Sequence, residues 1–366
     1  MPKFQGSKNY VHGSDSCLGV LITNLGTPEA ATQSAVRKYL AEFLWDPRVV
    51  EIPRPIWWLI LHGIILRTRP RKSAEAYKMV WTDEGSPLLV ISKQQRDALQ
   101  IALEKKLSSP VKVELGMRYG EPSIASALES LKAQGARRIL LFPLYPQYSA
   151  STTASTFDAV AKVFMQQRWM PELRMINNYG ADAGYINACA KQIQMHWQHN
   201  KRNQKLVFSF HGLPKRNLTQ GDPYHCECHE TARLITEKLN LRKDEWMITF
   251  QSRFGKAEWL QPYTIKTMET LPKDGVKSVD VFCPGFSADC LETLEEISMQ
   301  NKDVFMDAGG EAFSYIPALN AEDIHIDALA NIVKQHTQSW SKTSESYSVS
   351  EKDAVKQRAI KLGAKN

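Results

Sequence analysis

The feature that most constrains the fold of this 366-residue chain is an internal repeat. Nine residues, VLITNLGTP at 20–28, align without gaps on LVFSFHGLP at 206–214. In both stretches an apolar run typical of a buried strand ends at Gly and Pro, the residues that turn a chain. Two further marks recur in the same order, RYG at 118–120 with RFG at 253–255 and 135–143 with 275–284. The chain is therefore expected to contain two copies of one structural unit.

Strand-like and helix-like segments alternate within each copy. In the first copy, strands are expected at 17–25, 111–117 and 138–142, and helices at 31–43, 86–106 and 123–134. This alternation implies crossover connections and a parallel sheet. We expect an α/β fold of two similar domains, 17–180 and 181–335, each a parallel sheet flanked by helices, with the active-site cleft between them. A poorly ordered or marginally helical tail is expected at 341–366.

Composition and charge exclude several classes of protein. A hydrophobic content of 43% is typical of a globular protein. The formal net charge is +7, but the basic residues are spread along the chain and no nucleic-acid-binding module is visible. Six cysteines and a polar start without an apolar core predict reduced thiols and a cytoplasmic protein.

An unusual apolar segment lies in an insertion at about 45–85 in the first copy. The run IWWLILHGIIL at 56–66 precedes the basic cluster RTRPRK at 67–72. It has about half of the ~20 apolar residues that a membrane-spanning helix needs. Either Trp57 and Trp58 lie at headgroup depth, so that Ile56 to Lys72 contacts the inner face of the plasma membrane, or the segment is a buried helix.

His211 ends the apolar run of the second copy. Ligands bind at the carboxyl ends of strands in open α/β sheets, and a histidine there can exchange a proton near neutral pH. The repeat places His211 and Leu25 at equivalent strand ends facing a shared cleft. The alternative is that the His211 ring only bonds a neighbouring carbonyl group.

A second candidate lies at 282–297, FCPGFSADCLETLEEI. A helix is expected to begin near Cys290, with Ser287 or Asp289 as its N-cap. Glu292 and Glu296 would then lie one turn apart on the same face. With the His211 imidazole they could bind a divalent first-row metal or support a proton acceptor. Alternatively, the acids only favour the positive end of the helix dipole.

Other motifs carry less information. HCECH at 225–229 lacks the second ligand pair typical of zinc sites, so no metal is predicted there. No phosphate-binding Gly-rich loop, dinucleotide fingerprint or nucleophile elbow is present, which disfavours kinases, Rossmann dehydrogenases and ordinary hydrolases.

From about Gly19 to Ala330 the chain resembles the ferrochelatase family. The motifs that carry this resemblance are NLGTPE at 24–29, RTRPRKSAEAY at 67–77, GSPL at 85–88, GMRY at 116–119, SFHGLPKRNLTQGDPY at 209–224, FQSRFGKAEWLQP at 250–262 and CPGFSADCLETLEE at 283–296. The resemblance implies two chelatase-type domains and insertion of Fe(II) into protoporphyrin IX, which gives protohaem.

The resemblance also implies roles for individual residues. His211 matches the family's active-site histidine and Glu292 its partner glutamate, both as catalytic and as metal-binding groups. Glu296 continues the acidic line along the helix. The residues that would bind the porphyrin are Leu25, Ser86, Arg118, Tyr119 and Trp259.

Two departures from the family bear on cofactors. Relatives with a [2Fe-2S] cluster usually hold it mainly with cysteines in a C-terminal extension, and none follows Cys290 here, so no cluster is expected. Some relatives have histidine at the position of Cys290, which leaves a metal-relay role there open. Iron is a substrate, and no cofactor is required. The alternative functions are a coproporphyrin III ferrochelatase and a porphyrin- or haem-binding protein without catalysis.

Overall fold

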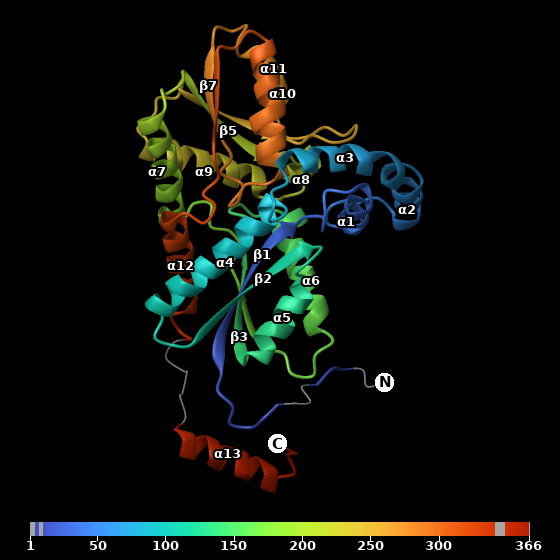
Figure 1. The fold of residues 1–366 in the computed structure, drawn as a ribbon, viewed down its shortest axis with the longest axis vertical. Helices are drawn as coiled ribbons and strands as arrows, with labels where there is room; N and C mark the ends of the chain where they lie inside the picture. The colour runs from blue at the N-terminus through green and yellow to red at the C-terminus, as the bar shows by residue number, and fades with distance from the viewer. Residues whose placement is uncertain (1–3, 7–9, 341–347, 366) are drawn as a thin grey trace.

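Two four-stranded parallel sheets form the framework of the protein (Figure 1). The computed structural model describes residues 4–6, 10–340 and 348–365. The strands of the first sheet are β1 Cys17–Gly26, β2 Val111–Tyr119, β3 Ala136–Pro143 and β4 Glu172–Met175. Those of the second are β5 Lys205–His211, β6 Trp246–Gln251, β7 Ser278–Phe282 and β8 Ala312–Ile316.

The two sheets share one strand order, which confirms the predicted repeat and the α/β fold class. The orders are β2-β1-β3-β4 and β6-β5-β7-β8, so the two repeated nine-residue stretches begin on the equivalent strands β1 and β5. The strands β2 and β6, which are second in chain order in their halves, also make equivalent backbone hydrogen bonds to a later proline. The Met117 amide donates to Pro122 O at 2.6 Å, and the Phe250 amide donates to Pro262 O at 2.8 Å.

Helices cover both faces of each sheet. The helices of the first half are α1 Gln33–Trp45, α2 Arg54–Ile60, η1 Leu61–Ile65, α3 Leu66–Val80, α4 Pro87–Lys106, α5 Ile124–Ala133, η2 Ala150–Ala154 and α6 Ser155–Phe164. The later helices are α7 Ala183–His199, α8 Lys215–Thr219, α9 Tyr224–Lys238, α10 Thr264–Thr270, η3 Glu292–Asn301, α11 Lys302–Asp307, α12 Asp323–Thr337 and α13 Val349–Lys361. The elements η1, η2 and η3 are π-helices.

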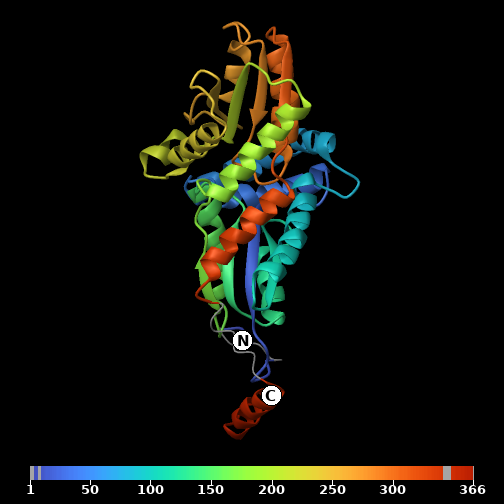
Figure 2. The same cartoon turned by 90° about the vertical axis from the view of Figure 1, so that its left-hand side faces the viewer.

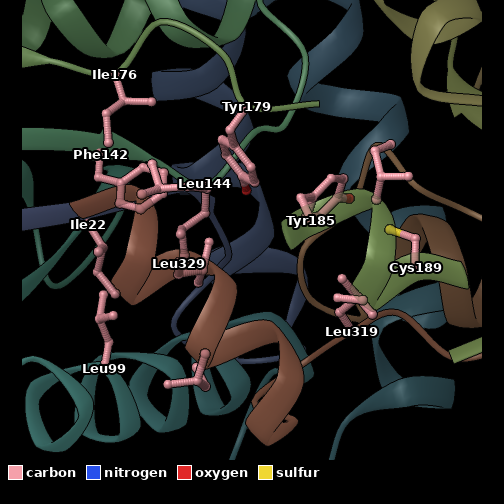
Figure 3. Close-up of a cluster of buried hydrophobic side chains, with 14 of the residues drawn as sticks. Ile22, Leu99, Phe142, Leu144, Ile176, Tyr179, Tyr185, Cys189, Leu319 and Leu329 are labelled. Carbon is pink, nitrogen blue, oxygen red and sulfur yellow. The ribbon is translucent and has the colours of Figure 1, made fainter. Parts of the chain in front are cut away.

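One apolar core runs through both halves of the molecule. Helix α12 follows the last strand of the second sheet but packs on α4 and α7, and it also contacts β3 of the first sheet (Figures 1 and 2). Leu329 of α12 joins Leu99 of α4, Phe142 of β3 and Cys189 of α7 in a single cluster of buried side chains (Figure 3). This cluster fixes the two sheets relative to each other.

The insertion in the first half forms α2, η1 and α3, and its two tryptophans have different environments. Trp57 is buried, and its indole N–H donates to Leu44 O at 2.7 Å. Trp58, in contrast, is 51% exposed. The expectation that both rings lie at headgroup depth is therefore wrong for Trp57, because helical spacing turns adjacent side chains to different faces. Within the described residues, no helix has the length and apolar content needed to cross a bilayer.

The C-terminal tail, expected to be poorly ordered or marginally helical, contains a helix in its described part. Residues 341–347 and 366 lie outside the described residues, but Val349–Lys361 forms the helix α13. Ser348 and Glu351 make a reciprocal capping box at its start. This cap satisfies free amide groups at the helix start and so favours the helix, although none of its residues is buried.

Gly26 is required where β1 ends beside β2. Its φ of +108° is unfavourable for other residues, and an added Cβ would overlap the Tyr119 carbonyl oxygen. We expect Gly26→Ala to lower the free energy of unfolding by about 3 kcal/mol or more, because the β1–β2 contact must open. Chemical denaturation measures this change. The control is Gly63→Ala, whose Cβ meets nothing within 4 Å and which should change stability by about 1 kcal/mol or less. Equal losses in the two variants would contradict the assignment.

Candidate active site

His211 is the last residue of β5, and its ring has a defined orientation. The Nδ1 atom lies 2.7 Å from Gly212 O, and the Tyr224 hydroxyl donates to the His211 carbonyl at 3.0 Å. A carbonyl oxygen only accepts hydrogen bonds, which assigns the ring proton to Nδ1. In the neutral ring, Nε2 therefore carries the lone pair and can take up a proton or bind a metal.

The strand positions His211 by its alternation. Phe208 and Phe210 pack into the core beneath α9, so Ser209 and His211 point to the opposite face of the sheet, where η3 lies. Gly212 then allows a close approach to β6, because an added Cβ would lie 2.6 Å from Gln251 O. The bonded carbonyl anticipated in the alternative interpretation is present, and it orients the ring toward η3.

The end of β6 holds η3 against His211. Gln251 donates from its side-chain amide to Glu292 O at 2.8 Å, and the Ser252 amide donates to Glu296 Oε1 at 2.7 Å. Ser252 has a φ of +62°, a conformation that costs free energy and is concentrated at functional sites. The Ser252 hydroxyl also donates to Glu296. Glu296 is thereby fixed at the end of the strand beside His211.

The start of this helix differs from the predicted capped α-helix. Its π-helical turns begin at Glu292, and neither Ser287 nor Asp289 caps the backbone. Instead, the Asp289 carboxylate accepts from the Thr293 hydroxyl at 3.0 Å and from Asn320 Nδ2 at 2.8 Å. Asp289 thus ties the first turn to the loop that follows β8.

Glu292 and Glu296, two of the acids of η3, have different neighbours. Burial raises the pKa of Glu296, and the nearby Glu292 raises it further. The hydrogen bonds from Ser252 and the charge of His211 lower this pKa, but burial outweighs them. Glu292 points toward α1 and α3: burial raises the pKa of Tyr39 and Tyr77, and the Glu292 carboxylate raises it further. The acidic pair therefore extends from the insertion to the end of β5.

Arg69 is a candidate residue that the sequence analysis missed within the basic cluster. Its guanidinium lies 4.2 Å from the centre of the Phe254 ring, and burial lowers its pKa while Glu292 raises it. In the described part of the chain, no carboxylate oxygen lies within 4.0 Å of the Arg69 nitrogens. The neighbouring cations Arg67, Arg71 and Lys72 are exposed, whereas Arg69 is partly buried. A partly buried cation without a close anion can accept an anionic group of a ligand. Helical periodicity across 67–72 was the sequence signal that could have distinguished Arg69 from its neighbours.

Three residues predicted to bind the ligand are engaged with other protein groups. Tyr119 is buried and donates to Asp46 Oδ2 at 2.8 Å. Arg118 pairs with Asp46 and donates from Nε to Ser155 Oγ at 2.7 Å. Ser86 is buried and accepts from the Thr27 hydroxyl at 2.8 Å. These three side chains pack beside the end of β1.

Asp46 is the common partner of Arg118 and Tyr119, and the sequence analysis missed this residue too. Burial raises its pKa, but hydrogen bonds from the Ser155 hydroxyl, the Arg48 amide and the Tyr119 hydroxyl, with the Arg118 charge, lower it overall. The carboxylate is therefore ionised at neutral pH and pairs with Arg118. An acid directly before a proline, Asp46-Pro47, gives no sequence signal of such a role.

Leu25 and Trp259, the other predicted porphyrin-binding residues, are both partly buried. Leu25 is half-buried and packs on the apolar cluster that contains Tyr119 and partly buried Leu291, next to Glu292. The Trp259 ring centre lies 6.5 Å from that of His211, and no described residue accepts from its buried indole N–H. The structure thus brings Leu25, His211, Trp259 and the acids of η3 to one junction between the sheets.

Comparison with known proteins gives a consistent match. Residues 17–337 match the family model described as Ferrochelatase. A ferrochelatase of Marinobacter nauticus is 58% identical over 337 residues, covering 92% of this chain and 91% of the relative. One of Thioalkalivibrio sulfidiphilus is 54% identical over 368 residues, covering 100% of both. The solved structure of SirB from Bacillus subtilis with Fe3+ has a TM-score of 0.54 and 13% identity, covers 89% of this chain and 98% of that one, and supports the fold alone.

The raised pKa of Glu296 predicts a pH-dependent stability. The folded chain binds the Glu296 proton more tightly than the unfolded chain does. The free energy of unfolding therefore falls as the pH rises from 4.5, the ordinary carboxyl pKa, through the folded-state pKa. Glu296→Gln removes this loss, and its amide can keep both bonds to Ser252. We expect the melting temperature of the variant, relative to the wild type, to increase with pH above 4.5.

Thermal unfolding between pH 4.5 and 8 measures this difference. Glu129→Gln, which removes a carboxylate that is 68% exposed on α5, is the matched control. A melting-temperature difference for Glu296→Gln that stays constant across the pH range would contradict the assignment.

Proposed function

This chain belongs to the ferrochelatase family, and from this premise we infer that it is an enzyme that inserts ferrous iron into protoporphyrin IX. The product is protohaem, which places the reaction in haem biosynthesis. The observation that supports the assignment of residues best is the His211 ring, whose Nε2 lone pair lies on the face of the sheet that carries Glu292 and Glu296.

The reaction requires a base. Iron enters as Fe²⁺ while two pyrrole N–H bonds break, so two protons leave and the charge balances without a redox change. We assign His211 Nε2 as the acceptor of a pyrrole proton, because an imidazole is the side chain best suited to exchange protons near neutral pH. Its Nδ1–H bond to Gly212 O also stabilises the imidazolium form that results.

Glu296 and Glu292 extend this role along η3. The buried Glu296 has a raised pKa, so it can receive a proton from His211 and release it again. Glu292 lies nearer the insertion than Glu296 does. An imidazole and a carboxylate together suit a divalent first-row ion. We assign His211 and Glu292 as the groups that bind the incoming iron, and Glu296 as the next member of a proton or metal relay.

The surrounding residues suit a flat apolar ring with acidic side groups. Leu25 and Trp259 offer apolar surface near His211. Tyr119, Ser86 and Arg118 pack beside the end of β1. Arg69, partly buried and without a close carboxylate among the described residues, fits a carboxylate of the porphyrin. Such a pair neutralises a charge that would otherwise be costly to bury.

We also propose that the insertion docks on a membrane surface from the cytoplasmic side. On α2 and η1, four apolar side chains are more than half exposed: Ile56, Trp58, Leu59 and Ile64. Arg67, Arg71 and Lys72 are exposed on the adjoining α3, where they can approach anionic lipid. Protoporphyrin is poorly soluble in water, and contact with a membrane would bring the cleft close to its source.

The proposed reaction uses no resident cofactor. Iron is consumed as a substrate and keeps its ferrous state. We further propose that the chain holds no [2Fe-2S] cluster, since Cys189, Cys228 and Cys283 are buried in apolar clusters on different elements.

His211→Ala is the most direct test of the catalytic assignment. Without the Nε2 acceptor we expect kcat for Fe²⁺ insertion into protoporphyrin to fall at least ~100-fold. Protoporphyrin binding, followed by fluorescence quenching, should be retained. Absorbance under anaerobic conditions measures turnover, and His199→Gln, an exposed histidine on α7, is the control.

The wild-type arm of this experiment separates the alternative functions. A protein that binds protoporphyrin but never metallates it would be a carrier, which contradicts the enzyme assignment. Faster turnover of coproporphyrin III than of protoporphyrin IX would overturn the substrate. A His211→Ala variant with nearly wild-type turnover would remove His211 from the chemistry.

The membrane proposal predicts a loss of vesicle binding. In the triple variant Trp58→Asn, Leu59→Asn, Ile64→Asn, we expect partition onto vesicles containing anionic phospholipid to fall at least tenfold, since each side chain contributes about 1 kcal/mol or more when buried. Flotation measures the bound fraction, and added salt should weaken wild-type binding.

Ile101→Asn on α4 is the matched control, because this side chain is 54% exposed and lies outside the insertion. Trp57 is avoided because it is a core residue. Vesicle binding by the triple variant at the wild-type level would rule out the insertion as the docking surface.

A further inference from the structure

Two histidines of the HCECH motif remain outside the proposed chemistry. His225 and His229 lie in the first turns of α9, separated by one helical turn, and their ring centres are 4.5 Å apart with an angle of 51° between the planes. Residues four apart lie on the same face of an α-helix. The fold therefore brings the two imidazoles together without help from any other element.

This pair is separate from the proposed catalytic residues. The His225 ring stacks on Phe250, with centres 5.5 Å apart, and Phe250 belongs to the core beneath α9. His211 and Glu296 lie on the opposite face of the same sheet. A ligand of the histidine pair would thus be bound on the outer side of the second sheet.

The ring nitrogens of the pair are available. No described residue forms a hydrogen bond with either ring. The nearest acid in the motif, Glu227, is already bonded to the Tyr148 amide at 2.7 Å and to Asn178 Nδ2 at 2.8 Å. Cys226 is exposed beside the pair.

We propose that His225 and His229 together bind one divalent first-row transition-metal ion, with water completing its coordination. Neutral imidazoles are the usual nitrogen ligands of Zn²⁺, Cu²⁺ and Ni²⁺, and histidines at i and i+4 are the ligand pair of helical zinc motifs. Among the described residues, no group of three or more His, Cys, Asp or Glu forms a metal site, so the pair is an open two-ligand site. Chelation by two rings holds the ion more firmly than one ring does.

The ligand type gives the site a selectivity that differs from the needs of the reaction. Imidazole sites bind divalent ions in the order Fe²⁺ < Ni²⁺ < Cu²⁺, with Zn²⁺ also above Fe²⁺. The pair is therefore expected to retain Zn²⁺ or Cu²⁺ in preference to the ferrous substrate. This inference does not depend on the roles assigned to His211 and Glu292.

Equilibrium dialysis with Zn²⁺ alone tests the site. The experiment compares the full-length His211→Ala protein with the same protein carrying His225→Gln and His229→Gln, so that the active-site histidine does not contribute. We expect the second protein to bind one equivalent of Zn²⁺ fewer. The matched control replaces two exposed histidines on different helices, His199→Gln and His336→Gln, and should keep the full stoichiometry.

Additional variants keep the test decisive. His229 is exposed, so the single change His229→Gln preserves the packing of His225 and should weaken Zn²⁺ binding at least tenfold. With His211 intact, the His225→Gln, His229→Gln protein should insert iron at the wild-type rate. Unchanged Zn²⁺ stoichiometry in the double variant would overturn the proposal. Loss of the same equivalent on Cys226→Ser, with both histidines present, would overturn the two-imidazole assignment.

Discussion

The continuous apolar core between the two sheets is the constraint on which the active site depends. Helix α12 leaves the second sheet and buries Leu329 among residues of α4, β3 and α7. Because interiors are close-packed, neither sheet can shift without opening this contact. The ends of β1 and β5 are thereby held at one junction, and the separation between Leu25 and His211 becomes a property of the core rather than of flexible loops.

Within this frame, a few hydrogen bonds set the chemistry. The end of β6 supplies Gln251 and Ser252, which hold η3 by one backbone carbonyl and one carboxylate. The same bonds oppose the effect of burial on Glu296, and they leave this acid close to His211. The end of β5 thus carries the proposed base, while the π-helix η3 carries the proposed acids. The outer face of the same sheet carries the histidine pair of α9, separated by the buried Phe250.

Much of the fold was predictable because its signals are local. Alternating apolar runs and turn residues located the strands, and the repeat of 20–28 at 206–214 predicted two equivalent central strands. The failures arose where packing decides. Trp57 and Trp58 are adjacent and chemically identical, yet one is buried against Leu44 and the other is exposed. Asp289 resembles an N-cap in sequence but bonds to Thr293 and Asn320, groups brought to it by the helix and by a distant loop.

The sequence by itself determined the α/β class, the duplication and the candidates His211, Glu292 and Glu296, because strand periodicity, turn residues and motif spacing are local properties of the chain. Only the tertiary structure decided which nitrogen of His211 is free and that burial raises the pKa of Glu296. It also separated the partly buried Arg69 from the exposed cations next to it. The physical reason is that hydrogen-bond partners and burial come from segments far apart in the chain.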